Sequence, residues 1–159
     1  MSDKISVGDI APDFTLKDSA NNDVNLKEVL KEKSVVLYFY PKDNTLGCTA
    51  QACSFRDSYE DFKKAGAEVI GVSSDTEDSH EKFIQKNKLP FILLSDKNGE
   101  LRKSYGVKTD LFGIIPGRVT YVIDKNSVVR YMFSSQMQTG KHIEKSLEII
   151  KFINSEEEK

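Results

Sequence analysis

Short apolar runs alternate with amphipathic stretches along most of this chain. Runs of β-branched and aromatic residues predict strands, because such side chains suit a pleated and buried backbone. These runs lie at 35–40, 67–73, 91–95, 119–124 and 128–133. The last two flank Lys125-Asn126-Ser127, a connection of hairpin length. A further small hairpin is expected near the N-terminus, where FTLKD and DVNL lie on either side of Asn21-Asn22-Asp23.

Helical patterns separate these runs. One helix is expected to follow the first central strand and to end near Gly66, and a second is expected over 77–88, before Pro90. A short helix is expected over 100–105, and a last one closes the chain. Apolar residues of the first and last helices recur at helical spacing: Phe55, Tyr59, Phe62, Ile143, Leu147 and Ile150.

The order of elements is strand, helix, strand, helix, strand, and then a hairpin and a closing helix. Continuous apolar strands between helices predict a sheet that is covered on both faces. A thioredoxin-like α/β sandwich, with a central mixed sheet flanked by helices, fits this order. A flavodoxin-like sheet has similar elements, and periodicity alone leaves it open.

Length and charge narrow the class of protein. The 159 residues suit one domain, expected over 1–154, with 155–159 (SEEEK) as a disordered acidic tail. A net charge of −2 with interspersed signs predicts neither nucleic-acid nor membrane binding. The N-terminal stretch has no signal-peptide core, so a cytoplasmic location is expected, with a plastid or other organelle as the alternative if a transit peptide was trimmed.

The only two cysteines, Cys48 and Cys53, lie just after the first central strand. Pro41 closes that strand, residues 42–47 form a loop, and Cys48 falls in the first turn of the next helix. At 100° per residue, Cys48 lies about 20° from Phe55 on the buried stripe, whereas Cys53 lies about 140° away on a polar face.

Three interpretations of these thiols differ in their demands. Inert thiols are commonly buried, but Cys53 on a charged face fits that poorly. A zinc site needs four ligands, and the only histidines, His80 and His142, lie in separate helices and are expected at the surface. No metal is therefore expected. A redox pair fits a reducing compartment best.

The spacing makes specific demands on a redox pair. Residues five apart in a helix have Cα atoms about 8.6 Å apart, beyond the roughly 7 Å limit of a disulfide. The helix start must therefore unwind before Cys48 and Cys53 can bond. Free N–H groups and the helix dipole stabilise a thiolate at Cys48. The Thr45 hydroxyl, three residues earlier, is expected to donate to the sulfur anion or to a substrate oxygen. A nearby arginine would add to this, and the residues alone leave Arg56 and Arg118 as equal candidates.

With these residues in view, the stretch resembles the peroxiredoxins, whose signature Pro-x-x-x-Thr/Ser-x-x-Cys is met by Pro41, Thr45 and Cys48. GCTAQACSFRD (47–57) is similar to the peroxiredoxin Q, or bacterioferritin comigratory protein, subfamily, which has a second cysteine five residues on. The likeness continues in APDFTL (11–16), VVLYFYPKDNT (35–45), DSYEDFKKAGAEVIGVSSD (57–75), LPFILLSD (89–96) and LFGIIPGRVTYVID (111–124).

The resemblance implies a thioredoxin-like fold with the N-terminal hairpin and a thiol-dependent hydroperoxide reductase. It makes Cys48 the peroxide-reacting thiol, Cys53 the resolving thiol, and Arg118, Thr45 and Pro41 the groups around the peroxide. The disulfide is then reduced by a thioredoxin-type dithiol, with no metal or organic cofactor. The subfamily is often monomeric, and a monomer is expected.

Two features qualify this interpretation. Family members usually have proline where this chain has Leu46. The apolar residues Leu111, Phe112 and Ile114 either pack on the core or form a rim for alkyl hydroperoxides or the reductant. Two alternative functions stay open: a peroxide sensor that passes its disulfide to client proteins, and a disulfide transferase, which the missing CxxC disfavours.

Overall fold

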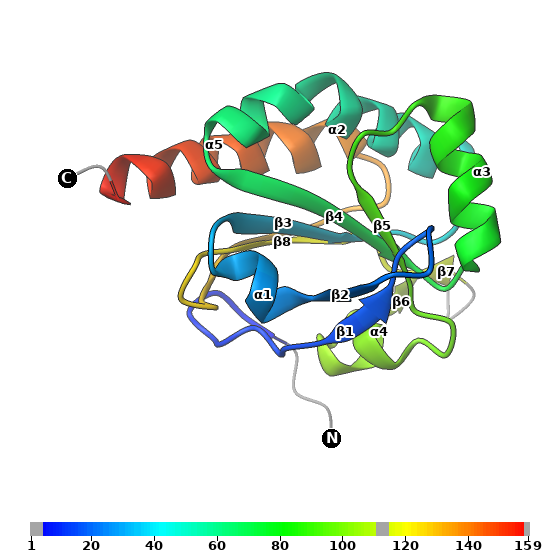
Figure 1. Cartoon of the computed structure of the whole chain (residues 1–159), viewed down its shortest axis with the longest axis horizontal. Coiled ribbons are helices and arrows are strands. Elements are labelled where there is room, and N and C mark those ends of the chain that lie inside the picture. The colour runs from blue at the N-terminus through cyan, green and yellow to red at the C-terminus, as the bar shows by residue number, and fades with distance from the viewer. Residues whose placement is uncertain (1–4, 111–114, 158–159) are drawn as a thin grey trace.

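A five-stranded mixed sheet carries the fold in the computed structural model, which describes residues 5–110 and 115–157 (Figure 1). Its strand order is β5-β4-β3-β8-β9. The parallel strands are β3 (Ser34–Phe39), β4 (Ala67–Ser73) and β5 (Ile92–Ser95), while β8 (Val119–Ile123) runs antiparallel to both β3 and β9 (Val129–Ser134). The antiparallel β8 confirms the thioredoxin-like fold over a flavodoxin-like sheet.

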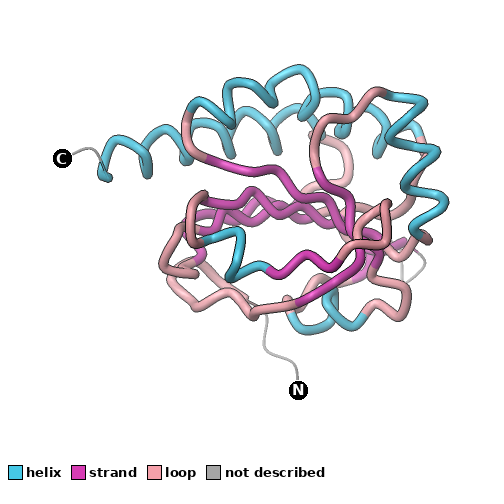
Figure 2. Tube along the Cα trace, viewed as in Figure 1, coloured by secondary structure: helices cyan, strands magenta, loops and turns pink. Residues whose placement is uncertain are grey.

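Helices cover both faces of this sheet (Figure 2). One face carries α2 (Leu46–Lys64), α3 (Glu77–Asn87) and α5 (Thr139–Glu157). The other carries the hairpin of β1 (Thr15–Lys17) and β2 (Asp23–Asn25), together with α1 (Leu26–Leu30) and α4 (Glu100–Ser104). The hairpin predicted near the N-terminus is therefore confirmed.

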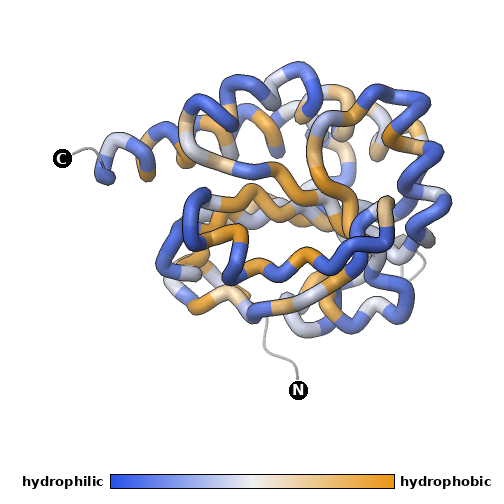
Figure 3. The backbone as a smooth tube through the Cα atoms, in the orientation of Figure 1, coloured by the Kyte–Doolittle hydropathy of each residue, from blue (hydrophilic) through white to orange (hydrophobic). Residues whose placement is uncertain are grey.

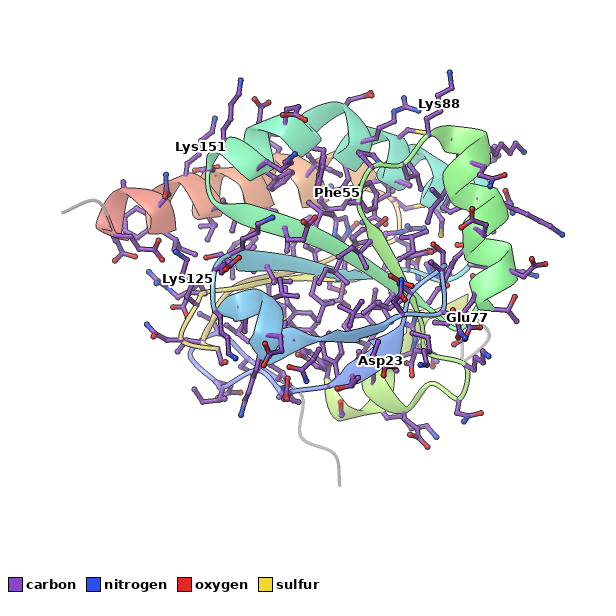
Figure 4. The ribbon with its side chains drawn as sticks, viewed as in Figure 1. Asp23, Phe55, Glu77, Lys88, Lys125 and Lys151 are labelled. Carbon is purple, nitrogen blue, oxygen red and sulfur yellow. The ribbon has the colours of Figure 1, made fainter. Side chains whose placement is uncertain are left out.

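The burial pattern explains the layers. Every residue of β3 and β4 is buried, as expected for strands with apolar side chains on both faces. Figure 3 shows the central strands as mostly orange, which marks apolar residues. Alternate side chains of β3 enter two cores, with Val36 and Tyr38 on the α2 side and Val35 and Leu37 on the α1 side. Phe55 of α2 points into the first core, whereas Lys88 and Lys151 point outward (Figure 4).

Three local elements differ from the prediction. The predicted second hairpin strand, DVNL, is β2 except for its last residue, and an unpredicted helix, α1, begins at Leu26. The Asn25 side-chain oxygen accepts a hydrogen bond from the Glu28 N–H and so caps this helix. A two-residue pair, β6 (Thr109–Asp110) and β7 (Ile115–Pro116), lies between α4 and β8. Helix α5 continues to Glu157, into the expected acidic tail, and Glu156 and Glu157 pair with Arg130 and Lys125.

Across the described ranges, no helix combines the length and the apolar character that crossing a membrane requires.

Candidate active site

Cys48 lies in the first turn of α2, where the sequence predicts it. The helix begins at Leu46, after Thr45 at the N-cap position, and Cys48 is its third residue. The first intrahelical hydrogen bond runs from the Thr49 N–H to the Thr45 carbonyl, so the N–H groups of residues 46–48 have no partner within the helix. Cys48 is only 1% exposed. Its sulfur therefore lies in a shielded position at the positive end of the helix dipole.

Arg118 brings a positive charge to this sulfur. Its Nη2 donates to the Cys48 Sγ at 3.3 Å, and Arg118 itself is buried just before β8. Gly47 allows this approach, because a Cβ atom at residue 47 would lie 3.0 Å from the Arg118 Nη2. Of the two candidate arginines, Arg118 reaches Cys48, while Arg56 lies further along α2 and pairs with Asp57.

Gln51 is a site residue that the sequence did not single out. It is fully buried one turn after Cys48, and its Oε1 accepts a hydrogen bond of 2.6 Å from the Arg118 Nη1. Gln51 Nε2 and Arg118 Nε are buried and have no hydrogen-bond partner among the described residues. Two donors on the side chains around Cys48 are therefore free for an oxygen-bearing ligand.

Pro41 and Thr45 lie in the loop between β3 and α2. Pro41 is half-buried, and Thr45 is exposed. The Thr45 hydroxyl donates to the Lys42 carbonyl at 3.0 Å and makes no capping bond to α2. Its oxygen lone pairs therefore remain available as acceptors, a different arrangement from the expected donation to the sulfur or to a substrate oxygen.

Asp43 connects this loop to neighbouring elements through hydrogen bonds. Its buried carboxylate accepts hydrogen bonds from the Tyr40 hydroxyl at 2.5 Å and from Ser79 at 2.9 Å, and it lies 2.8 Å from the His80 Nδ1. The Asp43 N–H donates to Asp75 at 2.8 Å. The sequence places Asp43 only within the loop of residues 42–47. The structure makes it a link between this loop and α3.

The expectation that both histidines lie at the surface is wrong. His80 and His142 are each 0% exposed. His80 Nε2 faces the Leu94 carbonyl at 3.0 Å, and Asp43, Asp75 and His80 bring three possible metal-ligating atoms within 4.8 Å of one another. All three side chains are already hydrogen-bonded within the protein, which accounts for the burial of Asp43 and His80, and Asp75 is only partly buried.

His142 connects the segment after β9 to β8. Its Nε2 donates to the Ser135 carbonyl at 2.8 Å, so its Nδ1 accepts from the Thr120 hydroxyl at 2.7 Å. Burial lowers the pKa of His142 to about 4; the Ser135 carbonyl opposes this effect, and the nearby Arg118 charge adds to it. No local sequence pattern indicates this burial, because the ring forms its hydrogen bonds with residues of other elements.

Cys53 lies on a different side of α2, as the helical spacing predicts. It is partly buried rather than solvent-facing, and its sulfur lies 3.8 Å from the Asn87 Oδ1 at the end of α3. Arg56 donates to the Asn87 carbonyl at 2.8 Å, close to this thiol. Both cysteines are free and both lie within the unbroken helix α2, so their Cα atoms are separated by the helical distance of about 8.6 Å.

Tyr38 extends the polar surroundings of Cys48 into the core. Burial raises the pKa of its phenol, and negative charge at Cys48 and Asp43 raises it further. Its ring stacks on Phe55 with centroids 4.5 Å apart. A neutral phenol thus lies between the sheet and α2. The apolar residues Leu111, Phe112 and Ile114, for which a rim or a core role was expected, lie outside the described residues.

Comparison with known proteins agrees with this geometry. The profile of the AhpC/TSA family matches residues 7–132. Arabidopsis thaliana peroxiredoxin Q, chloroplastic, is 57% identical over 148 residues, which are 93% of this chain and 68% of that protein.

Two solved structures share the fold. Peroxidoxin BcpB from Mycobacterium tuberculosis matches with a TM-score of 0.86 at 35% identity, covering 92% of this chain and 97% of that one. Xanthomonas campestris bacterioferritin comigratory protein, studied for its alkyl peroxide reduction activity, matches with a TM-score of 0.80 at 27% identity, covering 89% and 92%. The chain therefore belongs to the AhpC/TSA family of peroxiredoxins, which are thiol peroxidases, and it has peroxiredoxin Q proteins as relatives over most of its length.

Proposed function

We propose that this protein reduces hydrogen peroxide and organic hydroperoxides with the Cys48 thiolate, forms a Cys48–Cys53 disulfide, and is recycled by a thioredoxin-type dithiol. One observation carries the proposal: the Cys48 sulfur lies at the start of α2 with the Arg118 guanidinium 3.3 Å away. A helix N-terminus and a guanidinium both favour the thiolate, which is the nucleophilic form of cysteine.

The first step is an in-line displacement on the peroxide. The Cys48 thiolate attacks the peroxide oxygen that carries hydrogen, the O–O bond breaks, and the alkoxide or hydroxide leaves and takes up a proton. Cys48 becomes a sulfenic acid. Arg118, whose second arm is held by Gln51, stabilises the negative charge that moves from sulfur to the leaving oxygen.

The surrounding residues orient the peroxide. The N–H groups at the start of α2 donate hydrogen bonds to the peroxide oxygens, and the Thr45 oxygen accepts a hydrogen bond from the peroxide O–H. Pro41 has no N–H and so presents no competing donor. Because Cys48 is almost completely buried, the peroxide group must enter a narrow space while an alkyl substituent stays at the surface, beside the exposed Leu46.

Resolution requires a change of structure. Cys53 lies within the same helix, so the first turns of α2 must unwind and Cys53 must leave Asn87 before the two sulfurs can meet. The Cys53 thiolate then attacks the sulfenic sulfur, the S–O bond breaks, and water leaves after protonation. A dithiol reductant returns both thiols by exchange.

The comparisons favour one compartment, and the assembly stays an expectation. The Arabidopsis relative is a chloroplast protein by name, which favours the plastid alternative; the relatives give no support to the cytoplasm. Detection of this protein in plastid rather than cytosolic fractions of its source cells tests this inference. We expect a monomer, to be checked by light scattering of both redox forms.

Turnover separates this function from its alternatives. With excess thioredoxin and its reductase, the parent protein should consume many equivalents of peroxide, Cys48→Ser none, and Cys53→Ser far fewer before over-oxidation. A stall after one equivalent would instead support a sensor that passes its disulfide to clients. Peroxide consumption by Cys48→Ser at the parent rate would remove Cys48 from the site.

A further inference from the structure

A second buried arginine lies on the opposite side of the sheet from α2. Arg102 is in the short helix α4 and is 8% exposed. Its guanidinium passes the Phe39 ring, 5.8 Å from the centroid, toward the end of β3 where the catalytic loop begins. Neither the spacing of the motif nor the reaction described above requires this residue.

The Arg102 guanidinium holds two backbone carbonyls at once. Its Nη2 donates to the Tyr40 carbonyl at 3.0 Å, and its Nη1 donates to the Gly117 carbonyl at 2.9 Å. Tyr40 immediately precedes Pro41, and Gly117 immediately precedes Arg118. The two hydrogen bonds therefore fix the peptide planes through which the chain enters Pro41 and Arg118.

Both carbonyls need such a partner. The last pair in the β3–β8 ladder is Phe39 with Val119, so the carbonyls of Tyr40 and Gly117 lie just beyond the sheet. Buried carbonyls without a donor are costly, and the planar guanidinium fork reaches both with one side chain. Position 117 also requires glycine, since a Cβ atom there would lie 2.2 Å from the Lys108 carbonyl oxygen.

Arg102 is itself held in place. The Asp96 carboxylate accepts hydrogen bonds from the N–H groups of Leu101 and Arg102 at 3.1 and 3.0 Å. Burial lowers the pKa of Arg102, while negative charge at Asp96 and at Cys48 acts in the opposite direction. An arginine nevertheless stays protonated, so a fixed positive charge lies behind the catalytic loop.

We propose that Arg102 is a positioning residue of the peroxidase site, which sets Pro41 and Arg118 relative to Cys48 through the carbonyls of Tyr40 and Gly117. The inference rests on the proposed role of Cys48 as the peroxide-reacting thiol. Arg102 donates to these two carbonyls, whereas the donor to the Cys48 sulfur is Arg118. Its effect should therefore fall on the geometry of peroxide attack more than on the reactivity of the thiol.

Two reactions of Cys48 separate these effects. In the Cys53→Ser background, the rate of Cys48 oxidation by hydrogen peroxide depends on the peroxide pocket, whereas alkylation by iodoacetamide requires only an accessible thiolate. We expect Arg102→Met to lower the peroxide rate by about 10- to 100-fold, because small misplacements of reacting groups cost that much. The iodoacetamide rate, compared at a pH above which it no longer rises, should change by no more than about threefold. Arg102→Lys, which keeps the charge and can reach one carbonyl, should recover part of the peroxide rate.

A destabilised control completes the test. Leu30→Ala removes a buried side chain of α1, so it should lower the melting temperature without changing either rate. If Arg102→Met does not fold, Arg102→Gln takes its place. Three outcomes would overturn the proposal. Arg102→Met could keep a peroxide rate within about threefold of the parent, or it could lose both rates equally. Leu30→Ala could show the same selective loss of the peroxide rate. If the parent itself does not react with peroxide, the proposed function fails, and the failure is visible before any Arg102 variant is compared.

Discussion

Arg118 reaches Cys48 with one arm of its guanidinium while Gln51 holds the other. A long arginine side chain has many rotamers, and a second hydrogen bond removes most of that freedom. The carboxamide also keeps this environment neutral, so it orients the cation without placing a negative charge near the thiolate. At the scale of single residues, a neutral side chain therefore orients the arginine that lies beside the cysteine sulfur.

Replacing Gln51 by leucine tests this support. Gln51→Leu removes a hydrogen bond to a charged group, worth about 1.5–3 kcal/mol, and leaves Arg118 free to turn away from the sulfur. We expect the rate of Cys48 oxidation by peroxide to fall by about 10-fold or more. Competition with a haem peroxidase for hydrogen peroxide measures this rate. Glu60→Gln, on the exposed face of the same helix, should leave it unchanged, and a normal rate for Gln51→Leu would show that Arg118 needs no such support.

The residues of the site differ in how visible they are in the sequence. Pro41, Thr45 and Cys48 lie within one strand–loop–helix segment, so local spacing predicts that they lie together. Arg118 was placed beside them only by the family resemblance. Gln51, Asp43 and Arg102 act through hydrogen bonds to distant parts of the chain, such as Asp43 to His80 and Arg102 to Gly117, and no local pattern encodes those contacts.

At the scale of elements, the first turns of α2 must be both ordered and able to open. In the proposed mechanism they are ordered when Cys48 meets peroxide, and they unwind when Cys53 approaches. Leu46 occupies the first helical position, is 93% exposed and makes no intrahelical N–H bond. It therefore contributes little that would hold the turn closed.

Restoring the family's proline at this position should strengthen the turn. Proline suits the first helical position, and the backbone of Thr45, with φ −84° and ψ 157°, is compatible with a following proline. We expect Leu46→Pro to raise the free energy of unfolding by about 0.4–1 kcal/mol, mainly by restricting the unfolded chain. Urea denaturation measures this change. Leu46→Ala is the control for the lost side chain, and destabilisation by proline relative to alanine would contradict the account of this turn.

Elements with strong periodicity were well predicted. The buried strands and the helices with apolar stripes lie where expected, because sheet and helix geometry alone demands those patterns. Helix α1 was not predicted, because its five residues are too few to show a helical period. Helix α5 extends beyond its predicted end because Glu156 and Glu157 are paired with residues of β9 and its preceding turn.

At the scale of the whole molecule, stability depends on polar groups that are buried at the ends of the strands. His142 joins β8 to the segment after β9, and burial lowers its pKa from 6.5 to about 4. Between these two values the unfolded chain binds a proton that the folded protein does not bind. Stability should therefore be full above pH 6.5 and fall as the pH drops toward 4, by up to about 3 kcal/mol.

His142→Gln removes this titration. The parent protein should lose stability between pH 6.5 and 4 more steeply than the variant, although the variant starts from a lower value because a buried network is altered. Chemical denaturation of both proteins across this range gives the comparison. His80 and the carboxylates are common to both, so parallel pH profiles would mean that His142 is not the group responsible.

The most direct test of the whole account is intact mass after one equivalent of hydrogen peroxide, with over-oxidation avoided. The account predicts that the parent protein loses the mass of two hydrogens, through a Cys48–Cys53 disulfide, and that Cys53→Ser gains the mass of one oxygen at Cys48. An unchanged mass for the parent, or an added oxygen retained on the parent without disulfide formation, would contradict it.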